Sequence, residues 1–167
     1  MRIGFNIAGV ICHRGENADL NADIVQRMHG HVANGDTLFI VSFCGRNRVE
    51  SSMQFLTRVG IVPNLVQPQH VYFIGNDKHA KVGLMNHLKL DVFIEDQPKV
   101  AKKLRQGQFN VSEKRWRVWR KAPGTTGDLG ADSWQRWDTV LGDWGELLDQ
   151  PFLGEVELYE KQPPPNF

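Results

Sequence analysis

The sequence predicts an α/β fold, a Rossmann-like three-layer αβα sandwich with a central parallel sheet. Short apolar runs alternate with helix-like segments from residue 1 to residue 105, as in a sheet whose crossover connections are helices. The first run, residues 1–10, ends at Gly9-Val10 and opens into a polar loop. Its length and apolar character suit the central strand of a parallel sheet.

The composition excludes several classes of protein. The chain has 167 residues and a net charge of +1, with 20 Lys and Arg against 19 Asp and Glu, so no overall charge draws it to nucleic acid or an anionic membrane. Its two cysteines, Cys12 and Cys44, lack zinc-site spacing. Without a recognisable signal peptide or membrane-spanning run, we expect a soluble, cytoplasmic protein. We expect one α/β domain over residues 1–150 and a tail, residues 151–167, with a short strand and a flexible Pro-rich end.

A helix and a second strand are predicted after the first loop. Apolar residues at helical spacing predict a helix with Asp19 or Asn21 as its N-cap and the Asn-Gly pair at residues 34–35 as its stop. Residues 37–41 are the next apolar run and end at Ser42, which predicts a second buried strand with a polar tip. The apolar positions of the helix are Ile24, Val25, Met28 and Val32.

The middle of the chain continues the alternation. Residues 92–94 predict a fourth strand that is closed by Glu95 and Asp96. Pro98 fits the first turn of the following helix, because a missing N–H costs nothing there. The other predicted elements are a helix at residues 50–59, a strand at 71–75, a helix from Asp77 or Lys78 to Lys89, and a helix at 99–105.

The last third of the chain has a different composition. Basic and aromatic residues alternate over residues 115–120, which favours a half-buried edge strand over a nucleic-acid-binding stripe. A Gly-rich loop follows at residues 122–130. Tryptophan and aliphatic residues then recur at three- and four-residue intervals, so we predict an amphipathic helix over residues 134–148. A final strand is predicted at residues 155–159.

Polar or backbone groups follow three of the predicted strands. Asn6 and Ala8 follow the first strand, Ser42 ends the second, and Glu95 and Asp96 close the fourth. In open α/β sheets, ligands bind beyond the carboxyl ends of the strands. Each residue has a simpler interpretation on its own, such as a strand end or the acidic entry to a helix. Their convergence at one edge of the sheet predicts a functional site.

These strand tips resemble those of the haloacid dehalogenase-like superfamily, and most closely its small phosphatases and 5′-nucleotidases without a large cap domain. The resemblance spans roughly residues 1–104. It is carried by the first strand with Gly9-Val10, the second strand ending in Ser42, Lys81 at the start of a helix, and Glu95-Asp96.

The resemblance also exposes a departure. In active members, two aspartates one residue apart end the first strand: one attacks the phosphoryl group to form an aspartyl phosphate, and the other moves protons. Here Asn6 and Ala8 occupy those positions. An amide is a poor nucleophile and a methyl group cannot transfer a proton. We therefore expect a pseudoenzyme with a binding or regulatory role.

The resemblance implies that the residues that bind phosphate and metal remain, although the catalytic pair is lost. Ser42 is expected to bind a phosphoryl oxygen and Lys81 to neutralise its charge, with Lys78 as the alternative lysine. Mg²⁺ is the implied cofactor because it prefers oxygen ligands, and its affinity is expected to be weakened by the loss of one carboxylate. The implied Mg²⁺ ligands are Asn6, Ala8 through its carbonyl oxygen, Glu95 and Asp96.

Two other functions remain open. An active, nucleotidase-like phosphohydrolase would use Asp96, Cys12 or Cys44 in a non-standard role, since both cysteines follow strand tips. An interaction module would instead use the Trp-rich C-terminal region to dock a protein. The expected partner is a small phosphate-containing ligand or a protein, and neither a membrane nor nucleic acid is expected.

Overall fold

The computed structural model describes residues 1–13, 19–74, 78–107, 118–121, 134–136, 147 and 150–160. The strands are β1 (Arg2–Phe5), β2 (Thr37–Phe43), β3 (Val71–Ile74), β4 (Val92–Glu95), β5 (Val118–Lys121), β6 (Trp134–Arg136) and β7 (Glu155–Leu158). The helices are α1 (Ala22–Ala33), α2 (Val49–Arg58), α3 (Lys78–His87) and α4 (Pro98–Gln106), with short 3₁₀ turns at Arg46–Arg48 and Pro68–His70.

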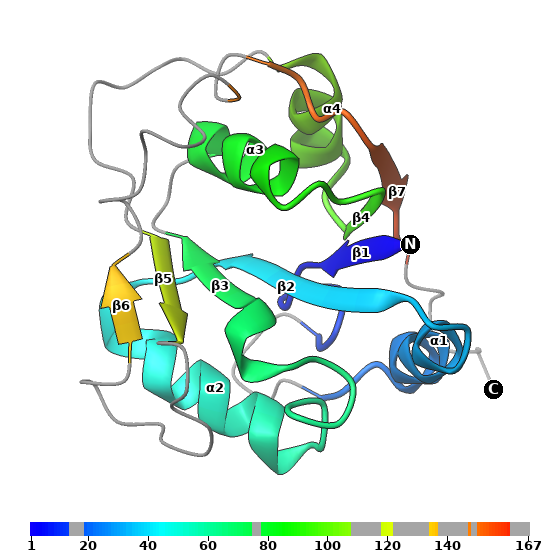
Figure 1. Cartoon of the computed structure of the whole chain (residues 1–167), viewed down its shortest axis with the longest axis vertical. Coiled ribbons are helices and arrows are strands. Elements are labelled where there is room, and N and C mark those ends of the chain that lie inside the picture. Colours follow the sequence, from blue (N-terminus) through cyan, green and yellow to red (C-terminus); the bar gives the residue numbers. More distant parts are fainter. Residues whose placement is uncertain are drawn as a thin grey trace, which may run out of the picture.

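The described strands form one sheet in the order β6-β5-β3-β2-β1-β4-β7 (Figure 1). The strands β3, β2, β1, β4 and β7 run parallel, whereas at one edge β5 pairs antiparallel with β3, and β6 pairs antiparallel with β5. In β1, Ile3 lies opposite Leu38 of β2 and Val92 of β4. This order confirms the predicted Rossmann-like α/β sandwich and the central position of the first strand.

Helices cover both faces of this sheet (Figure 1). On the face of α1 and α2, Phe5 and Met28 lie in one buried core. On the face of α3 and α4, Phe93 and Leu104 lie in a second core. Because successive residues of a strand point to opposite faces, β4 contributes Phe93 to one core and Ile94 to the other.

The helix ends follow the expected signals, with one difference. Pro98 lies in the first turn of α4, and Asn34 ends α1 just before Gly35, whose φ is +85°. Asn21 occupies the N-cap position of α1, but its side chain does not cap the helix. Its Nδ2 instead donates to the carbonyl oxygen of Val10 at 2.6 Å. This bond ties the loop after β1 to the start of α1.

The predicted aromatic helix at residues 134–148 is wrong at its start. Trp134–Arg136 form β6, which pairs antiparallel with β5. A strand of three residues is too short to show in a hydrophobic period, and its pairing with a neighbouring strand determines its conformation. Of the remainder of the predicted helix, only Leu147 lies within the described residues.

The described helices are short. α1 has 12 residues and the other three have 9 or 10, whereas an apolar helix needs about 20 residues to cross a bilayer. No helix within the described ranges combines the length and the apolar character that a membrane crossing requires.

Candidate functional site

The tip of β1 is a tight, buried loop. Asn6 follows the strand and is only 5% exposed. The backbone then turns so closely that the carbonyl oxygen of Ile7 accepts the backbone N–H groups of Val10, Ile11 and Cys12, at 3.2, 2.9 and 3.2 Å. Gly9 has a φ of +82°, a conformation that L side chains rarely adopt. The loop is therefore held by its own backbone hydrogen bonds.

This loop and the end of β4 bring three predicted site residues together. The Asn6 Nδ2 donates to the carbonyl oxygen of Ala8 at 3.0 Å and lies 3.5 Å from Oδ1 of Asp96. The Asp96 carboxyl group also packs onto Gly9, since a Cβ atom built there would lie 1.9 Å from Oδ2. Only glycine leaves room for this contact. The Asn6, Ala8 and Asp96 positions thus form one compact cluster.

Lys81 and Glu95 form a buried ion pair beside this cluster. Lys81 Nζ lies 3.2 Å from Oε2 of Glu95, and the two residues are 0% and 2% exposed. The ammonium group also lies 4.6 Å from the ring centres of both Phe43 and Phe93, a distance at which a cation is attracted to an aromatic face. Lys81 is thus a buried residue, not a solvated one.

Opposing effects act on the pKa of the Glu95 carboxyl group, and their net result is a rise. Burial raises the pKa of the Glu95 carboxyl group, and a hydrogen bond with Asp96 and the charge of Asp96 raise it further, while the Lys81 ammonium group opposes the rise. Glu95 also accepts the backbone N–H of Gln97 through Oε1 at 3.4 Å. Both carboxyl oxygens of Glu95 therefore have partners within the protein.

Ser42 ends β2 at the same edge of the sheet. It is 4% exposed, and among the described residues its hydroxyl group has no hydrogen-bond partner. Its neighbours Val41 and Phe43 belong to the core under α3 and α4, so strand alternation turns Ser42 toward the α1 and α2 face. Lys81 approaches from α3, on the other face. The alternative lysine, Lys78, begins α3, and its side chain lies outside the described part of the chain.

The two cysteines lie near these tips in protected positions. Cys12 is buried. Burial raises the pKa of the Cys44 thiol, while a hydrogen bond with Ser52 and the charge of Arg48 lower it less. A nucleophilic cysteine needs a lowered pKa. The environment of Cys44 therefore disfavours the thiolate that a cysteine-based hydrolase requires.

The polar cluster is a poor match to the implied Mg²⁺ ligands. Asn6 turns its nitrogen, not its oxygen, toward Ala8 and Asp96, and Glu95 is engaged by Lys81. Within the described residues, no group of three or more His, Cys, Asp or Glu side chains is placed to share a metal ion. Since Mg²⁺ requires several oxygen ligands, the groups at this tip do not fit it as they are arranged.

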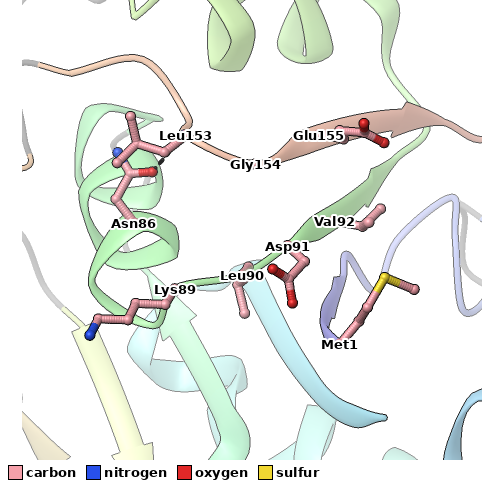
Figure 2. A pocket seen from close by; sticks show the side chains of 9 residues that line it. All are labelled: Met1, Asn86, Lys89, Leu90, Asp91, Val92, Leu153, Gly154 and Glu155. Atoms are coloured by element: carbon pink, nitrogen blue, oxygen red, sulfur yellow. Dashed lines mark hydrogen bonds between the residues drawn. The ribbon is translucent and has the colours of Figure 1, made fainter. Parts of the chain in front are cut away.

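A pocket of about 540 Å³ lies at the opposite end of the sheet, where β1, β4 and β7 begin (Figure 2). Asn86 forms one wall, and its side chain donates to the carbonyl oxygen of Pro151 at 3.0 Å and accepts the backbone N–H of Leu153 at 2.9 Å. On the other side, Oδ2 of Asp91 accepts the backbone N–H of Arg2 at 2.7 Å. The sequence offered no signal for this pocket, because its walls come from separate parts of the chain. Its lining residues are Met1, Asn86, Lys89, Leu90, Asp91, Val92, Leu153, Gly154 and Glu155.

Comparison with protein-family models, with curated proteins and with solved structures finds no match to this chain.

Proposed function

We propose that this chain is a haloacid dehalogenase-like domain that binds a small phosphate-containing ligand and does not hydrolyse it by way of an aspartyl phosphate. The observation that carries the proposal is the identity and placement of Asn6 and Ala8. Both lie at the tip of the central strand, within reach of Asp96. They occupy the positions where the resemblance implies a nucleophile and a proton donor.

The chemistry of the two side chains supports a role without turnover. The amide nitrogen of Asn6 has no basic lone pair and already donates to the Ala8 carbonyl oxygen at 3.0 Å. The methyl group of Ala8 cannot protonate a leaving oxygen or activate water. Because catalytic groups that act together lose most of the rate when one is removed, two neutral replacements leave binding as the supported activity.

Ser42 supports the ligand-binding part of the proposal. A buried hydroxyl group without a hydrogen bond costs free energy, and a ligand oxygen can supply the missing partner. Ser42 is 4% exposed and no described protein group bonds to its hydroxyl. By the resemblance, a phosphoryl oxygen would take this place, whereas Lys81, the balancing positive charge that the resemblance implies, is engaged by Glu95 at 3.2 Å.

Thermal unfolding in inorganic phosphate tests this proposal, with sodium chloride at matched ionic strength as the reference. A ligand that binds the native state stabilises it by about 2.7 kcal/mol at 100 times its Kd. We expect phosphate to raise the Tm of the wild-type protein and not that of Ser42→Ala. Ser51→Ala is the matched control, since Ser51 is exposed and bonds only locally to the Arg48 carbonyl oxygen.

Hydrolysis of an aryl phosphate is measured beside the unfolding curves. We expect no turnover by the wild-type protein and a gain of turnover in the double variant Asn6→Asp, Ala8→Asp. Equal Tm values in phosphate and chloride would count against the anion site. Wild-type turnover that follows the protein through purification would reject the proposed lack of catalysis.

A further inference from the structure

The orientation of the Asn6 side chain is set by its surroundings. Its amide group has a donor end and an acceptor end. Both neighbouring groups, the Ala8 carbonyl oxygen at 3.0 Å and Asp96 Oδ1 at 3.5 Å, are acceptors. The oxygen of the amide would face two oxygen atoms if the group were turned over. The donor end must therefore point between Ala8 and Asp96.

We infer that the Asn6 amide takes the place of a divalent cation at the tip of β1, so that this end of the sheet is held together without metal. The NH₂ group bridges the carbonyl oxygen of Ala8 and the carboxylate of Asp96, two of the oxygen groups that the resemblance would assign to Mg²⁺. The inference concerns how these residues are held, and it stands whether or not the tip binds phosphate.

Charge balance gives the physical reason. A carboxylate at position 6 would lie beside that of Asp96, and two carboxylates at this distance cannot both ionise unless a cation or a proton lies between them. The neutral amide removes that requirement. The other nearby carboxylate, Glu95, is already paired with Lys81 at 3.2 Å. With an amide at position 6, the cluster carries one carboxylate charge fewer than it would with a second aspartate, so it attracts a divalent cation less strongly.

Packing around Asp96 also favours the arrangement in which the Asn6 amide bridges Ala8 and Asp96. The carboxyl group lies against Gly9, where a Cβ atom would come within 1.9 Å of Oδ2, and Asn6 beside it is 5% exposed. A hydrated Mg²⁺ keeps several of its water molecules. Admitting it would require Asn6 to turn away and its hydrogen bond to Ala8 to break.

The test is thermal unfolding in MgCl₂ against sodium chloride of equal ionic strength, with no phosphate in either solution. We expect the wild-type Tm to be the same in both salts. Asn6→Asp is expected to be less stable without metal and to regain stability saturably with Mg²⁺, binding it roughly 10-fold tighter or more than the wild-type protein, since affinity rises with ligand charge. The response should disappear in Asn6→Asp, Asp96→Asn.

Asn6→Ala is the matched control, because it removes the bridge and adds no charge. It is expected to lower the Tm equally in both salts. If Asn6→Asp is unfolded without metal, the measurement becomes refolding on addition of MgCl₂, with the same expected result. A saturable Mg²⁺ stabilisation of the wild-type protein that Asp96→Asn abolishes would overturn the inference, as would a folded Asn6→Asp with no Mg²⁺ response. Because phosphate is absent, neither outcome depends on the proposed ligand.

Discussion

The two ends of the sheet differ in how many of their polar side chains are buried. At the carboxyl end, Asn6, Ser42, Lys81 and Glu95 are all buried. At the amino end, the pocket of about 540 Å³ is lined by buried Asn86 but also by exposed residues, with Leu153 66% exposed (Figure 2). The residues of the predicted site and the pocket therefore lie at opposite ends of the same strands.

The difference shows that a pocket and a cluster of buried polar side chains need not coincide. Buried polar groups carry a desolvation cost that specific partners must offset. Each substitution at the carboxyl end should therefore lower the free energy of unfolding of the protein. Exposed groups at the amino end have water as an alternative partner. The following predictions test this contrast.

The largest effect is expected at Lys81. Lys81→Met leaves Glu95 buried without its cation, and breaking a buried ion pair in this way typically costs about 3–5 kcal/mol. Lys89→Met, at the exposed amino end, is the matched control and should change the free energy of unfolding by no more than about 0.5 kcal/mol. Urea unfolding at pH 7 measures both. Similar values for the two variants would remove the contrast between the ends.

The cost of Lys81→Met should also depend on pH. Burial already raises the pKa of Glu95 above its ordinary value of 4.5, and loss of Lys81 should raise it further. An acid whose pKa is higher in the folded state than in the unfolded state loses stability as the pH rises from its unfolded to its folded pKa. The penalty should therefore be smaller near pH 4.5 than at pH 7. A penalty independent of pH would mean that lost packing, not charge, causes it.

An intermediate effect is expected at Gly9. Gly9 and Gly35 have nearly the same φ, +82° and +85°, but only Gly9 would bring a Cβ atom against Asp96, while Gly35 has open space. Both alanine variants should lose about 1–2 kcal/mol from the left-handed backbone conformation. Gly9→Ala should lose a further ~1–3 kcal/mol from overpacking. Equal losses in urea unfolding would show that the Asp96 carboxyl group moves aside at no cost.

The smallest effect is expected at Asp91. Its carboxylate accepts the backbone N–H of Arg2 at 2.7 Å, but the residue is exposed. Because water can replace this bond, Asp91→Asn should cost no more than about 1 kcal/mol. The same unfolding experiment measures it, and a loss as large as that of Lys81→Met would show that an exposed hydrogen bond at the amino end matters as much as the buried ion pair.

Much of the sheet could be predicted because its strands are buried on both faces. Apolar runs bounded by glycine and polar residues located β1, β2, β3 and β4, and the geometry of parallel strands places their polar tips at one edge. Asn6, Ala8 and Asp96 are therefore expected at this edge from the sequence, and in the structure the Asn6 Nδ2 lies 3.0 Å from the Ala8 carbonyl oxygen and 3.5 Å from Oδ1 of Asp96.

The remaining features depend on contacts that no local pattern records. Lys81 is on a helix where a solvated lysine is the common case, but in the fold its ammonium group lies against the rings of Phe43 and Phe93. The orientation of the Asn6 amide depends on Ala8 and Asp96, far apart in sequence. β6 forms where helical spacing suggested a helix, since pairing with β5 determines its conformation.

The position of β7 beside β4 has a consequence for the order in which the protein folds. β7 pairs with β4 along four residues, from Val92 opposite Glu155 to Glu95 opposite Leu158, although the two strands lie far apart in the sequence. Such non-local pairing gives a high contact order and slow folding. A nascent chain exposes the unpaired edge of β4 until residues 155–158 have been synthesised, and an open strand edge favours self-association. Pairing with β7 therefore covers this side of β4 late in synthesis, and β7 then becomes the edge strand of the sheet.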